Sequence, residues 1–485
     1  MFLDTPFFSE AYLAMSLHLY IYEKLKSGLK FTPTSCQEKL FSALAEFVVK
    51  RDGPDIFLIN GYAGTGKTSS VYSLITTMDE FDLKYLLLAP TGRAAKVLSG
   101  YTGKKSYTIH KQIYRQKSLK DGVGHFILDF NKSKDTIFIV DEASLISSGY
   151  NESALFGTGN LLDDLVTYVR SGEGDKLILI GDSAQLPPVG ENISRALDID
   201  TLSGYGSTES VTLSSVVRQA QDSGILHNAT ILRRMIEREE TGFPKFRTKG
   251  FADVERITGS DLIESLSDSF DSHGIDETLV VCRSNRQANR YNMGIRSKLL
   301  YREEQINKGD KVMVVKNCYQ FLEDIDGLDF IANGDVAELV RISNYEERYG
   351  LSFAQATLKF SDYNDIEISA KVILDTLSSE SANLGSEQNK ALFFSVFEDY
   401  SDIRIKRKRI AAVREDKYYN ALQIKYSNAI TVHKSQGGQW RNVYIDNPFY
   451  KGEIGIEDMK WLYTAITRAV DKVYFVNFDD RFFDN

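Results

Sequence analysis

The feature that most constrains the fold of this chain is a glycine-rich segment at residues 61–68, which reads Gly-Tyr-Ala-Gly-Thr-Gly-Lys-Thr. It matches the pattern G-x-x-x-x-G-K-[ST]. A β-branched apolar run at residues 56–59 precedes it, and a helical pattern through Val71, Leu74 and Ile75 follows it. Glycines let backbone N–H groups curve around phosphate oxygens, and the helix N-terminus adds positive potential. The segment therefore predicts a strand–loop–helix unit that holds a nucleoside triphosphate.

Within this loop the residues have separate expected roles. Lys67 would contact the β- and γ-phosphates of ATP, and the hydroxyl of Thr68 would bind Mg²⁺. The alternative, a glycine-rich turn that binds no ligand, is disfavoured by the strand and helix patterns on either side. The expected nucleotide-binding residues of the loop are Gly61, Tyr62, Ala63, Gly64, Thr65, Gly66, Lys67, Thr68 and Ser69.

A pair of carboxylates is expected to complete the site. The buried-strand pattern at residues 136–140 runs directly into Asp141 and Glu142. Asp141 would hold the magnesium ion, directly or through water, and Glu142 would polarise the attacking water. By itself such a pair is more often a solvated strand end. Combined with the upstream loop, it favours hydrolysis over phosphoryl transfer to a second substrate.

The alternation of apolar strands and helical stretches predicts an α/β fold with parallel sheets. Because the strands form two series, we expect two α/β domains. Residues 309–371, with short alternating strands and Gly/Asn/Asp turns, predict a small β module inserted into the second domain. The polar residues 377–420 are interpreted either as an extended helical arm or as a partly ordered segment. The strand series are 56–59, 85–88, 136–140 and 177–180, then 278–281, 429–432, 442–445 and 473–476, with a helical stretch at 286–300.

Composition excludes several classes of protein. The chain is 42% hydrophobic and 26% charged, as in ordinary globular proteins. It has no apolar run near the ~18 residues needed to span a bilayer, and its N-terminus lacks a signal-peptide pattern. Its cysteines, Cys36, Cys282 and Cys318, are scattered, which excludes a Cys-rich zinc site and argues against a disulfide framework. We therefore expect a cytoplasmic protein.

The net charge of −9 does not decide whether the partner is a polyanion, since a nucleic acid meets only one groove of a surface. Basic residues are densest at residues 404–409, Arg-Ile-Lys-Arg-Lys-Arg. That run is either a solvated helix face or an electrostatic contact with phosphates.

A series of further segments follows in order along the chain. Together with the two nucleotide motifs, this series resembles the motif set of superfamily 1 helicases, in the RecD-like branch that includes Dda. The resemblance covers roughly residues 37–476, and the segments at 181–189 and 431–437 are its most specific parts. The segments are Thr34-Ser-Cys-Gln37, Ala89-Pro-Thr-Gly-Arg-Ala-Ala95, Tyr107-Thr-Ile-His110, Gly181-Asp-Ser-Ala-Gln-Leu-Pro-Pro-Val189, Val217-Arg-Gln219, Gly309-Asp-Lys-Val-Met313, Ala429-Ile-Thr-Val-His-Lys-Ser-Gln-Gly437 and Tyr463-Thr-Ala-Ile-Thr-Arg468.

The resemblance implies two RecA-like P-loop domains with parallel sheets. It also implies an SH3-like β insertion in the second domain and a short hairpin insertion near residues 115–131 in the first. The expected boundaries are a helical extension at 1–30, the first RecA-like domain at 31–220, the second at 221–308 and 426–485, and the inserted module with its charged arm at 309–425.

The resemblance also implies roles for single residues. The amide of Gln37 would contact adenine, Gln185 would sense the γ-phosphate, and Arg218 and Arg468 would reach that phosphate from the far side. Plainer alternatives exist: Gln37 as a polar residue at a helix start, and each arginine as a surface ion-pair residue. The expected catalytic residues are Lys67, Asp141, Glu142, Gln185, Arg218 and Arg468, with Thr68 and Asp141 as magnesium ligands.

For a nucleic-acid strand, the resemblance implies contacts by Pro90, Thr91 and His110 in the first domain and by Thr431 and His433 in the second. Hydroxyl and imidazole groups can bind phosphate oxygens without distinguishing bases. The alternative for either histidine is a satisfied core residue.

A wedge that separates strands is expected in the hairpin at residues 115–131, with a turn near Asp121-Gly122 and Phe126 or Phe130 stacking on a base. A surface hairpin that packs its own aromatic rings is the alternative.

Two departures from the family pattern affect these expectations. Relatives often carry an acidic residue after the His-Lys-Ser-Gln-Gly motif, whereas this chain has Gly438-Gln439-Trp440, which puts a ribose contact there in doubt. The chain also lacks the long N-terminal region of larger RecD-like proteins and any metal-ligand set for a nuclease. It therefore resembles a compact helicase.

The expected function is an ATP-dependent DNA helicase that translocates 5′→3′ on single-stranded DNA, with a role in DNA repair, recombination or replication. Polarity and the preference for DNA come from the resemblance alone. The expected partners are single-stranded DNA and duplex junctions, with no membrane; a monomer is the simplest state, and RNA stays open. One alternative is a translocase or recruitment module that does not separate strands. A small-molecule kinase is disfavoured because it needs neither segment 181–189 nor segment 431–437.

Overall fold

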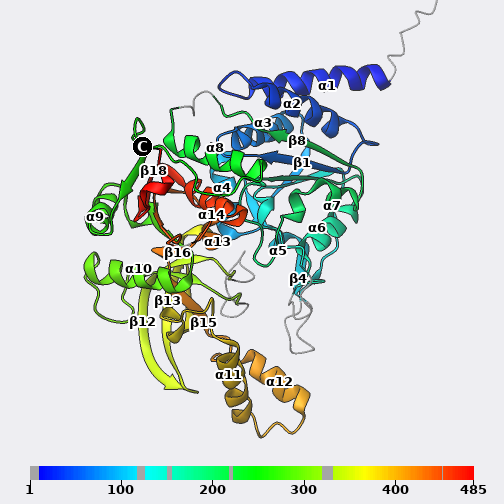
Figure 1. Ribbon diagram of the computed structural model, residues 1–485. Coiled ribbons are helices and arrows are strands. Elements are labelled where there is room, and N and C mark those ends of the chain that lie inside the picture. The colour runs from blue at the N-terminus through cyan, green and yellow to red at the C-terminus, as the bar shows by residue number, and fades with distance from the viewer. Residues whose placement is uncertain are drawn as a thin grey trace, which may run out of the picture. The chain divides into compact units, whose positions relative to one another are not determined.

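The structure is a computed structural model that describes residues 10–116, 126–149, 156–217, 222–318, 331–450 and 452–484, with side chains from Leu17 onward except Gln116. The chain divides into two compact units (Figure 1). Unit 1 comprises Met1–Pro90, Ala94–Ile113 and Leu128–Leu226. Unit 2 comprises Thr91–Arg93, Tyr114–Ile127 and His227–Asn485.

The larger sheet of unit 1 has the strand order β3-β2-β6-β7-β1-β8, and every pairing described in it is parallel. All side chains of β6 and β7 are buried, as expected for strands covered on both faces. The strands of the chain up to Leu226 are β1 (Ile56–Gly61), β2 (Lys84–Ala89), β3 (Ser106–Thr108), β4 (Tyr114–Gln116), β5 (Phe126–Leu128), β6 (Thr136–Val140), β7 (Lys176–Gly181) and β8 (Thr208–Leu213). The helices are α1 (Glu10–Ser27), α2 (Ser35–Val49), α3 (Lys67–Glu80), α4 (Gly92–Thr102), α5 (Ile109–Ile113), α6 (Leu161–Arg170) and α7 (Ile199–Ser203), with short 3₁₀ turns at Ala143–Leu145 and Arg195–Leu197.

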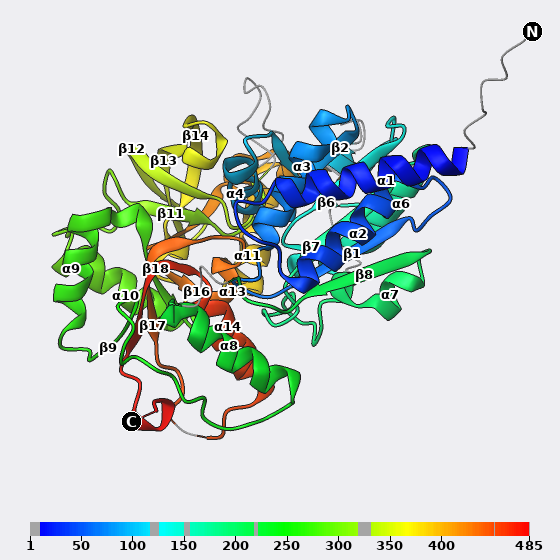
Figure 2. The same cartoon turned by 90° about the horizontal axis from the view of Figure 1, so that it is seen from above.

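Helices α1 and α2 lie side by side in unit 1 (Figure 2). Ile21 and Leu25 of α1 are buried in one core cluster with Leu40 and Phe41 of α2. The hydroxyl of Ser73 in α3 donates to the carbonyl of Leu25 at 2.6 Å, which ties the first helix to the phosphate-loop helix. The expected N-terminal helical extension is thus an integral part of the core of unit 1.

Unit 2 has its own parallel sheet, in the order β16-β10-β17-β18-β9. Two separate parallel sheets confirm the α/β fold class. One local expectation is wrong: β16 ends at Thr431, and Val432 begins α13 rather than ending the strand. The sheet strands are β9 (Val254–Ile257), β10 (Thr278–Cys282), β16 (Ala429–Thr431), β17 (Trp440–Asp446) and β18 (Ala469–Val476). The helices are α8 (Gly224–Glu237), which starts at the end of unit 1, α9 (Leu262–His273), α10 (Asn285–Lys298), α13 (Val432–Ser435) and α14 (Ile456–Ile466).

The β module of unit 2 is a closed barrel, as expected for an SH3-like insertion. Its core is lined by aliphatic residues and by Phe360 and Tyr426. A buried ion pair between Arg296 of α10 and Asp310 joins the module to the sheet-bearing part of the unit. The barrel strands are β11 (Lys311–Val314), β12 (Val336–Arg348), β13 (Leu351–Phe360), β14 (Ile366–Ile373) and β15 (Leu422–Tyr426); short 3₁₀ turns lie at Ile275–Glu277, Ser361–Tyr363, Asp375–Leu377 and Asp480–Phe482.

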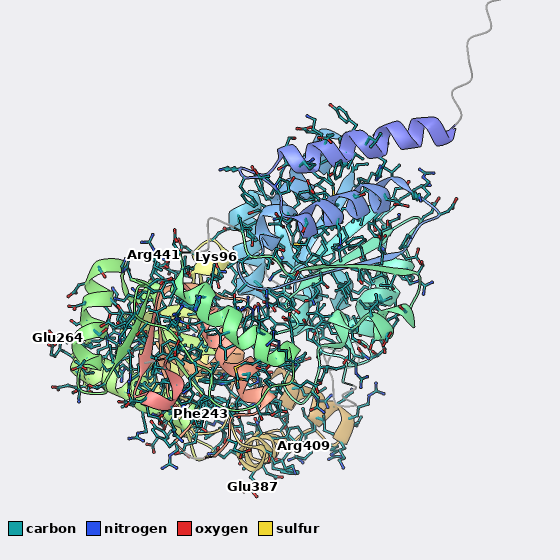
Figure 3. All side chains as sticks on the ribbon, turned by 45° about the horizontal axis from the view of Figure 1, so that its top comes forward. Lys96, Phe243, Glu264, Glu387, Arg409 and Arg441 are labelled. Carbon is teal, nitrogen blue, oxygen red and sulfur yellow. The ribbon has the colours of Figure 1, made fainter. Side chains whose placement is uncertain are left out.

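The polar segment at residues 377–420 contains two helices, α11 (Ser386–Asp399) and α12 (Lys406–Glu415) (Figure 1). This agrees with the helical-arm interpretation. Arg409 does not project into solvent: its guanidinium lies 3.7 Å from the centre of the Phe397 ring, and its Nε donates to the Phe397 carbonyl (Figure 3). The other basic residues of the run are exposed, and both interpretations stay open for them: Arg404, Lys406, Arg407 and Lys408.

Among the helices described, none combines the length and the apolar character needed to cross a bilayer.

Candidate functional site

The parallel sheet of unit 1 gathers the predicted nucleotide residues at one edge. Because its strands run in the same direction, their carboxyl ends meet there, and ligands of open α/β sheets bind at that edge. Neighbouring strands are aligned: Ile59 pairs with Ile180, and Leu88 pairs with Val140. The segments that leave this edge are the loop 61–66 after β1, Asp182 to Gln185 after β7, Asp141 and Glu142 after β6, Pro90 and Thr91 after β2, and His110 after β3.

The loop after β1 has the backbone of a phosphate cradle. Gly64 and Gly66 have φ values of 73° and 81°, in the left-handed region that glycine adopts without a Cβ penalty. A Cβ at Gly66 would lie 2.5 Å from Nε2 of Gln37, so that position is also closed to larger residues. Gly66 caps α3 without a side-chain hydrogen bond. The first N–H groups of α3 thus have no side-chain acceptor at the cap, as an anion-binding helix start requires.

Lys67 is held close to this loop. Its ammonium donates to the carbonyls of Gly61 and Tyr62, the second at 3.2 Å, and lies 3.7 Å from Oδ2 of Asp182. Asp182 is 1% exposed. A buried carboxylate beside the lysine fixes the position of its charge. Asp182 stands in the specific segment 181–189 but is not among the residues predicted from the sequence.

Gln37 is fully buried, and its side chain bonds both to the start of α2 and to the predicted phosphate loop. Its Oε1 accepts a hydrogen bond from the backbone N–H of Thr34 at 2.9 Å, and its own backbone N–H donates to the Thr34 hydroxyl at 3.4 Å; these two bonds form a capping box at the start of α2. Its Nε2 donates to the carbonyl of Thr65 at 3.5 Å. The residue therefore caps a helix and braces the phosphate loop, and the adenine contact stays a prediction.

The carboxylate of Asp141 is oriented through both of its oxygens. Oδ2 accepts a hydrogen bond from the hydroxyl of Tyr101 at 2.7 Å, and Oδ1 accepts one from the backbone N–H of Glu142 at 2.9 Å. Burial, and next the negative charge of Asp141, raise the pKa of Tyr101 well above its usual value, so the phenol remains a donor. Glu142 has φ 53°, which for a non-glycine residue is a strained conformation. Tyr101 is not among the residues predicted from the sequence.

Gln185 presents a buried acceptor. Its Oε1 has no hydrogen-bond partner among the described residues, although its backbone N–H donates to the carbonyl of Asp182 at 3.2 Å. An unpaired buried polar atom costs about 1–3 kcal/mol, so it marks a place where a ligand or water would be bound. This observation supports the predicted role of Gln185 near the reacting phosphate.

The residues expected to bind magnesium fit the usual chemistry of that ion. Thr68 is exposed in the first turn of α3, and Asp141 is half-buried with a lone pair left on each oxygen. In the described parts of the chain, no three His, Cys, Asp or Glu side chains form a metal-binding group. Mg²⁺ in nucleotide sites is typically bound by one or two protein groups together with phosphate oxygens and water. The donor set suits such a shared site.

Unit 2 carries the predicted strand contacts Thr431 and His433 at the carboxyl edge of its own sheet. Thr431 ends β16 beside Cys282 of β10, and the exposed His433 follows in α13. Desolvation and the charge of Arg283 lower the pKa of His433, which favours the neutral imidazole.

Arg468, which lies between α14 and β18, is 3% exposed, and its guanidinium donates to three oxygens. These are the carbonyls of Thr464 and Gly438, at 3.0 and 3.1 Å, and the hydroxyl of Thr467 at 3.3 Å. Gly438, where the chain departs from the family pattern, thus supplies a carbonyl that orients the arginine. The other predicted arginine, Arg218, lies outside the described residues.

The remaining predicted strand contacts belong to the first half of the chain. The His110 ring lies edge-on to Phe156, with centroids 4.8 Å apart, and burial lowers its pKa to about 4. In the predicted hairpin, β4 and β5 form a two-stranded sheet. Phe126 is buried, whereas Phe130 is 71% exposed and is therefore the better candidate for stacking. The turn predicted near Asp121-Gly122 lies outside the described residues.

Comparisons with known proteins agree with this arrangement. A family model described as an AAA domain matches residues 42–245, and one described as a UvrD-like helicase C-terminal domain matches residues 426–476. The chain is 23% identical to the uncharacterized protein MJ1519 of Methanocaldococcus jannaschii, over 90% of this chain and 38% of that protein. It is 26% identical to the ATP-dependent RecD2 DNA helicase of Deinococcus radiodurans, over 41% of this chain and 24% of that protein. The chain thus spans less than two fifths of the length of either relative.

Among solved structures, the Pif1 helicase from Bacteroides in complex with ADP-AlF3 and ssDNA aligns over 94% of this chain and 95% of that chain, with 15% identity and a TM-score of 0.46. The first family model covers the phosphate loop and the Asp141 carboxylate. The second covers Thr431, His433 and Arg468. The order of the motifs, these two matches and the RecD2 relative together support a superfamily 1 helicase of the RecD-like kind.

Proposed function

We propose that this chain is an ATP-dependent DNA helicase that moves 5′→3′ along single-stranded DNA and separates duplex strands ahead of it. The observation that supports this most directly is the division of the motor residues. Three predicted residues follow strands of the unit 1 sheet at the same edge: Lys67, Asp141 and Gln185. In contrast, Arg468 and Thr431 belong to unit 2, which has a separate sheet. A machine that alternates between two states needs such a division, because hydrolysis then changes the interaction between two bodies.

Each residue has a definite task in this proposal. Lys67 neutralises charge on the β- and γ-phosphates, and Glu142 accepts the proton of the attacking water. The unpaired Oε1 of Gln185 accepts a hydrogen bond from that water and so orients it. A bound Mg²⁺, held by Thr68 and Asp141, would draw charge from the phosphate oxygens. The guanidinium of Arg468 stabilises charge that develops on the transferred phosphoryl group.

Strand binding in this proposal uses contacts that do not depend on base identity. Pro90, Thr91 and His110 on one side, and Thr431 and His433 on the other, are polar or small groups suited to phosphate oxygens and sugars. When hydrolysis changes the distance between the two units, the two sets of contacts bind and release the strand in turn, and the strand advances by a small step.

The test is steady-state ATP hydrolysis with and without nucleic acid. We expect single-stranded DNA to raise kcat several-fold over the basal rate, with half-maximal stimulation that weakens as salt rises. Single-stranded RNA, duplex DNA and buffer alone are the comparison arms. Hydrolysis that no nucleic acid stimulates would contradict the proposal and favour a small-molecule kinase or another ATPase.

A translocase that does not separate strands is the alternative to a helicase, and the hairpin distinguishes them. Phe130 is exposed and Phe126 is buried. We expect Phe130→Ala to slow unwinding of a forked duplex while strand-stimulated hydrolysis is retained. The matched control is Phe394→Ala, which removes another exposed ring, from α11. Equal unwinding by both variants would place strand separation outside this hairpin.

A further inference from the structure

Two structural connections link Asp141 to Pro90–Thr91, the residues predicted to contact the nucleic-acid strand. The first connection is short and runs through the sheet. The backbone N–H of Asp141 donates to the carbonyl of Leu88 at 3.0 Å. Leu88 is the penultimate residue of β2, which ends at Ala89, and Pro90 and Thr91 follow directly. The magnesium carboxylate and the predicted strand contact therefore sit on hydrogen-bonded neighbouring strands.

A second connection runs through α4. This helix begins at Gly92, directly after Thr91, and ends at Thr102. Its 11 residues span about 16 Å at 1.5 Å per residue. In its last turn Tyr101 donates its hydroxyl to Oδ2 of Asp141 at 2.7 Å. The two connections close a ring that leads from Asp141 through β2 to the strand contact, and through α4 back to Asp141.

The hydrogen bond between Tyr101 and Asp141 could transmit a movement of α4 to the carboxylate. The ring packs against the core cluster of unit 1, which includes Leu98 of the same helix, so a movement of α4 would carry the phenol with it. Its hydroxyl holds one oxygen of Asp141 while the Glu142 N–H holds the other. A carboxylate accepts at about four lone-pair sites, so each oxygen keeps one for a ligand. A shift of the phenol would therefore rotate the carboxylate that is predicted to bind magnesium.

We propose that Tyr101 is a positioning residue that couples strand binding at Pro90–Thr91 to the magnesium-binding carboxylate of Asp141. This inference rests on the proposed function, because it concerns how a nucleic-acid strand stimulates hydrolysis. Contact of a phosphate backbone with the start of α4 sets the position of the helix. The position of the helix then determines, through the Tyr101 hydroxyl, the orientation of the Asp141 carboxylate. Neither Tyr101 nor α4 touches the reacting atoms in this scheme.

The experiment compares Tyr101→Phe with Tyr85→Phe. The control removes an equivalent bond in the same unit, since the Tyr85 hydroxyl donates to Oδ1 of Asp79 at 2.8 Å. Partners that orient metal ligands change metal affinity by about 10–100-fold when removed. We therefore expect Tyr101→Phe to raise, by about tenfold, the Mg²⁺ concentration that half-saturates binding of a fluorescent ADP analogue. Binding of the same analogue in EDTA should match that of the wild-type protein.

Two further readouts separate coupling from simple damage. The affinity for a fluorescent single-stranded oligonucleotide without nucleotide should be unchanged in Tyr101→Phe, and its melting temperature should stay close to that of Tyr85→Phe. The stimulation of hydrolysis by the same oligonucleotide, measured at saturating Mg²⁺, should fall severalfold in Tyr101→Phe and remain at the wild-type level in the control.

The outcomes distinguish this inference from the proposed function. If the wild-type protein shows strand-stimulated hydrolysis and Tyr101→Phe matches Tyr85→Phe in Mg²⁺ dependence and in stimulation, the coupling role is wrong and the helicase proposal stands. If the wild-type protein itself shows no stimulation, the proposed function fails first. A loss of oligonucleotide affinity in Tyr101→Phe would also overturn the inference, because Tyr101 would then belong to the strand contact.

Discussion

The charged side chain of Lys67, at the edge of the unit 1 sheet, is held in position by neighbouring oxygens. Lys67 donates to two loop carbonyls and faces the buried carboxylate of Asp182. This arrangement places a positive charge at the predicted phosphate loop. Removing the Lys67 side chain should therefore weaken phosphate binding far more than it lowers the stability of the fold.

Lys67→Ala should reduce kcat for ATP hydrolysis by at least about 100-fold, because the charge that stabilises the reacting phosphates is lost. Lys39→Ala, which removes an exposed lysine from α2, is the control and should hydrolyse ATP normally. Steady-state release of phosphate measures both. Normal turnover by Lys67→Ala would show that residues 61–68 are not the catalytic loop.

Arg468→Ala should reduce kcat by about 10³-fold or more if this arginine acts on the transferred phosphoryl group. Because the buried guanidinium also binds the Gly438 and Thr464 carbonyls, Arg468→Lys is needed as a second variant that keeps the charge but loses the planar fork. Arg441→Ala removes an exposed arginine of the same unit and is the control (Figure 3). Wild-type turnover in folded Arg468→Ala would rule out the assignment.

His110 makes stability depend on pH in a defined direction. Burial lowers its pKa to about 4, against about 6.5 in an unfolded chain, so between these values the unfolded state binds more protons. Its contribution is present above pH 6.5 and is lost as the pH falls toward 4. The urea midpoint of the wild-type protein should thus fall more between pH 7 and pH 5 than that of His110→Gln. The control His273→Gln, at an exposed site, should follow the wild type. Equal slopes in all three proteins would contradict the buried neutral imidazole.

At the scale of elements, the barrel of unit 2 is anchored by a buried charge cluster. Arg296 is 1% exposed, and its Nε and Nη2 each lie 3.1 Å from an oxygen of Asp310, which also pairs with Arg302. The Arg296 guanidinium lies 4.6 Å from the centre of the Tyr426 ring in β15. One side chain of α10 therefore contacts both the first and the last parts of the inserted module.

Asp310→Asn should destabilise the protein by about 3–5 kcal/mol, because it leaves the buried charge of Arg296 without a full partner. Asp365→Asn is the matched control: Asp365 lies on the same barrel and is 3.5 Å from Lys359 in an exposed pair, which is worth at most about 1 kcal/mol. Thermal unfolding followed by circular dichroism measures the difference. Similar melting temperatures for the two variants would mean that the cluster is not a structural anchor.

The sequence predicts the long apolar strands well because burial on both faces leaves a continuous pattern; residues 136–140 are predicted and observed with the same bounds. The strand β9 lacks that pattern, since Glu255 and Arg256 in its middle are exposed. Tyr101 and Asp182 escaped prediction for another reason. Their partners, Asp141 and Lys67, are distant along the chain, and only the folded sheet brings each pair together.

In the whole molecule, two sheet-bearing units are proposed to share the hydrolysis of ATP. The expected phosphate-binding groups belong to unit 1, and the buried Arg468 belongs to unit 2. Strand-gripping groups are expected at the carboxyl edge of both sheets. A motor built in this way should use ATP to move along one strand in one direction.

Unwinding of tailed duplexes tests that claim most directly. A labelled DNA duplex with a 5′ single-stranded tail, one with a 3′ tail and one with blunt ends are each mixed with the protein and ATP, and the released strand is measured in a single turnover. We expect strand release from the 5′-tailed duplex alone, and no release when ATP is omitted. Release from the 3′-tailed duplex would contradict the polarity, and release from none of the three would contradict the helicase itself.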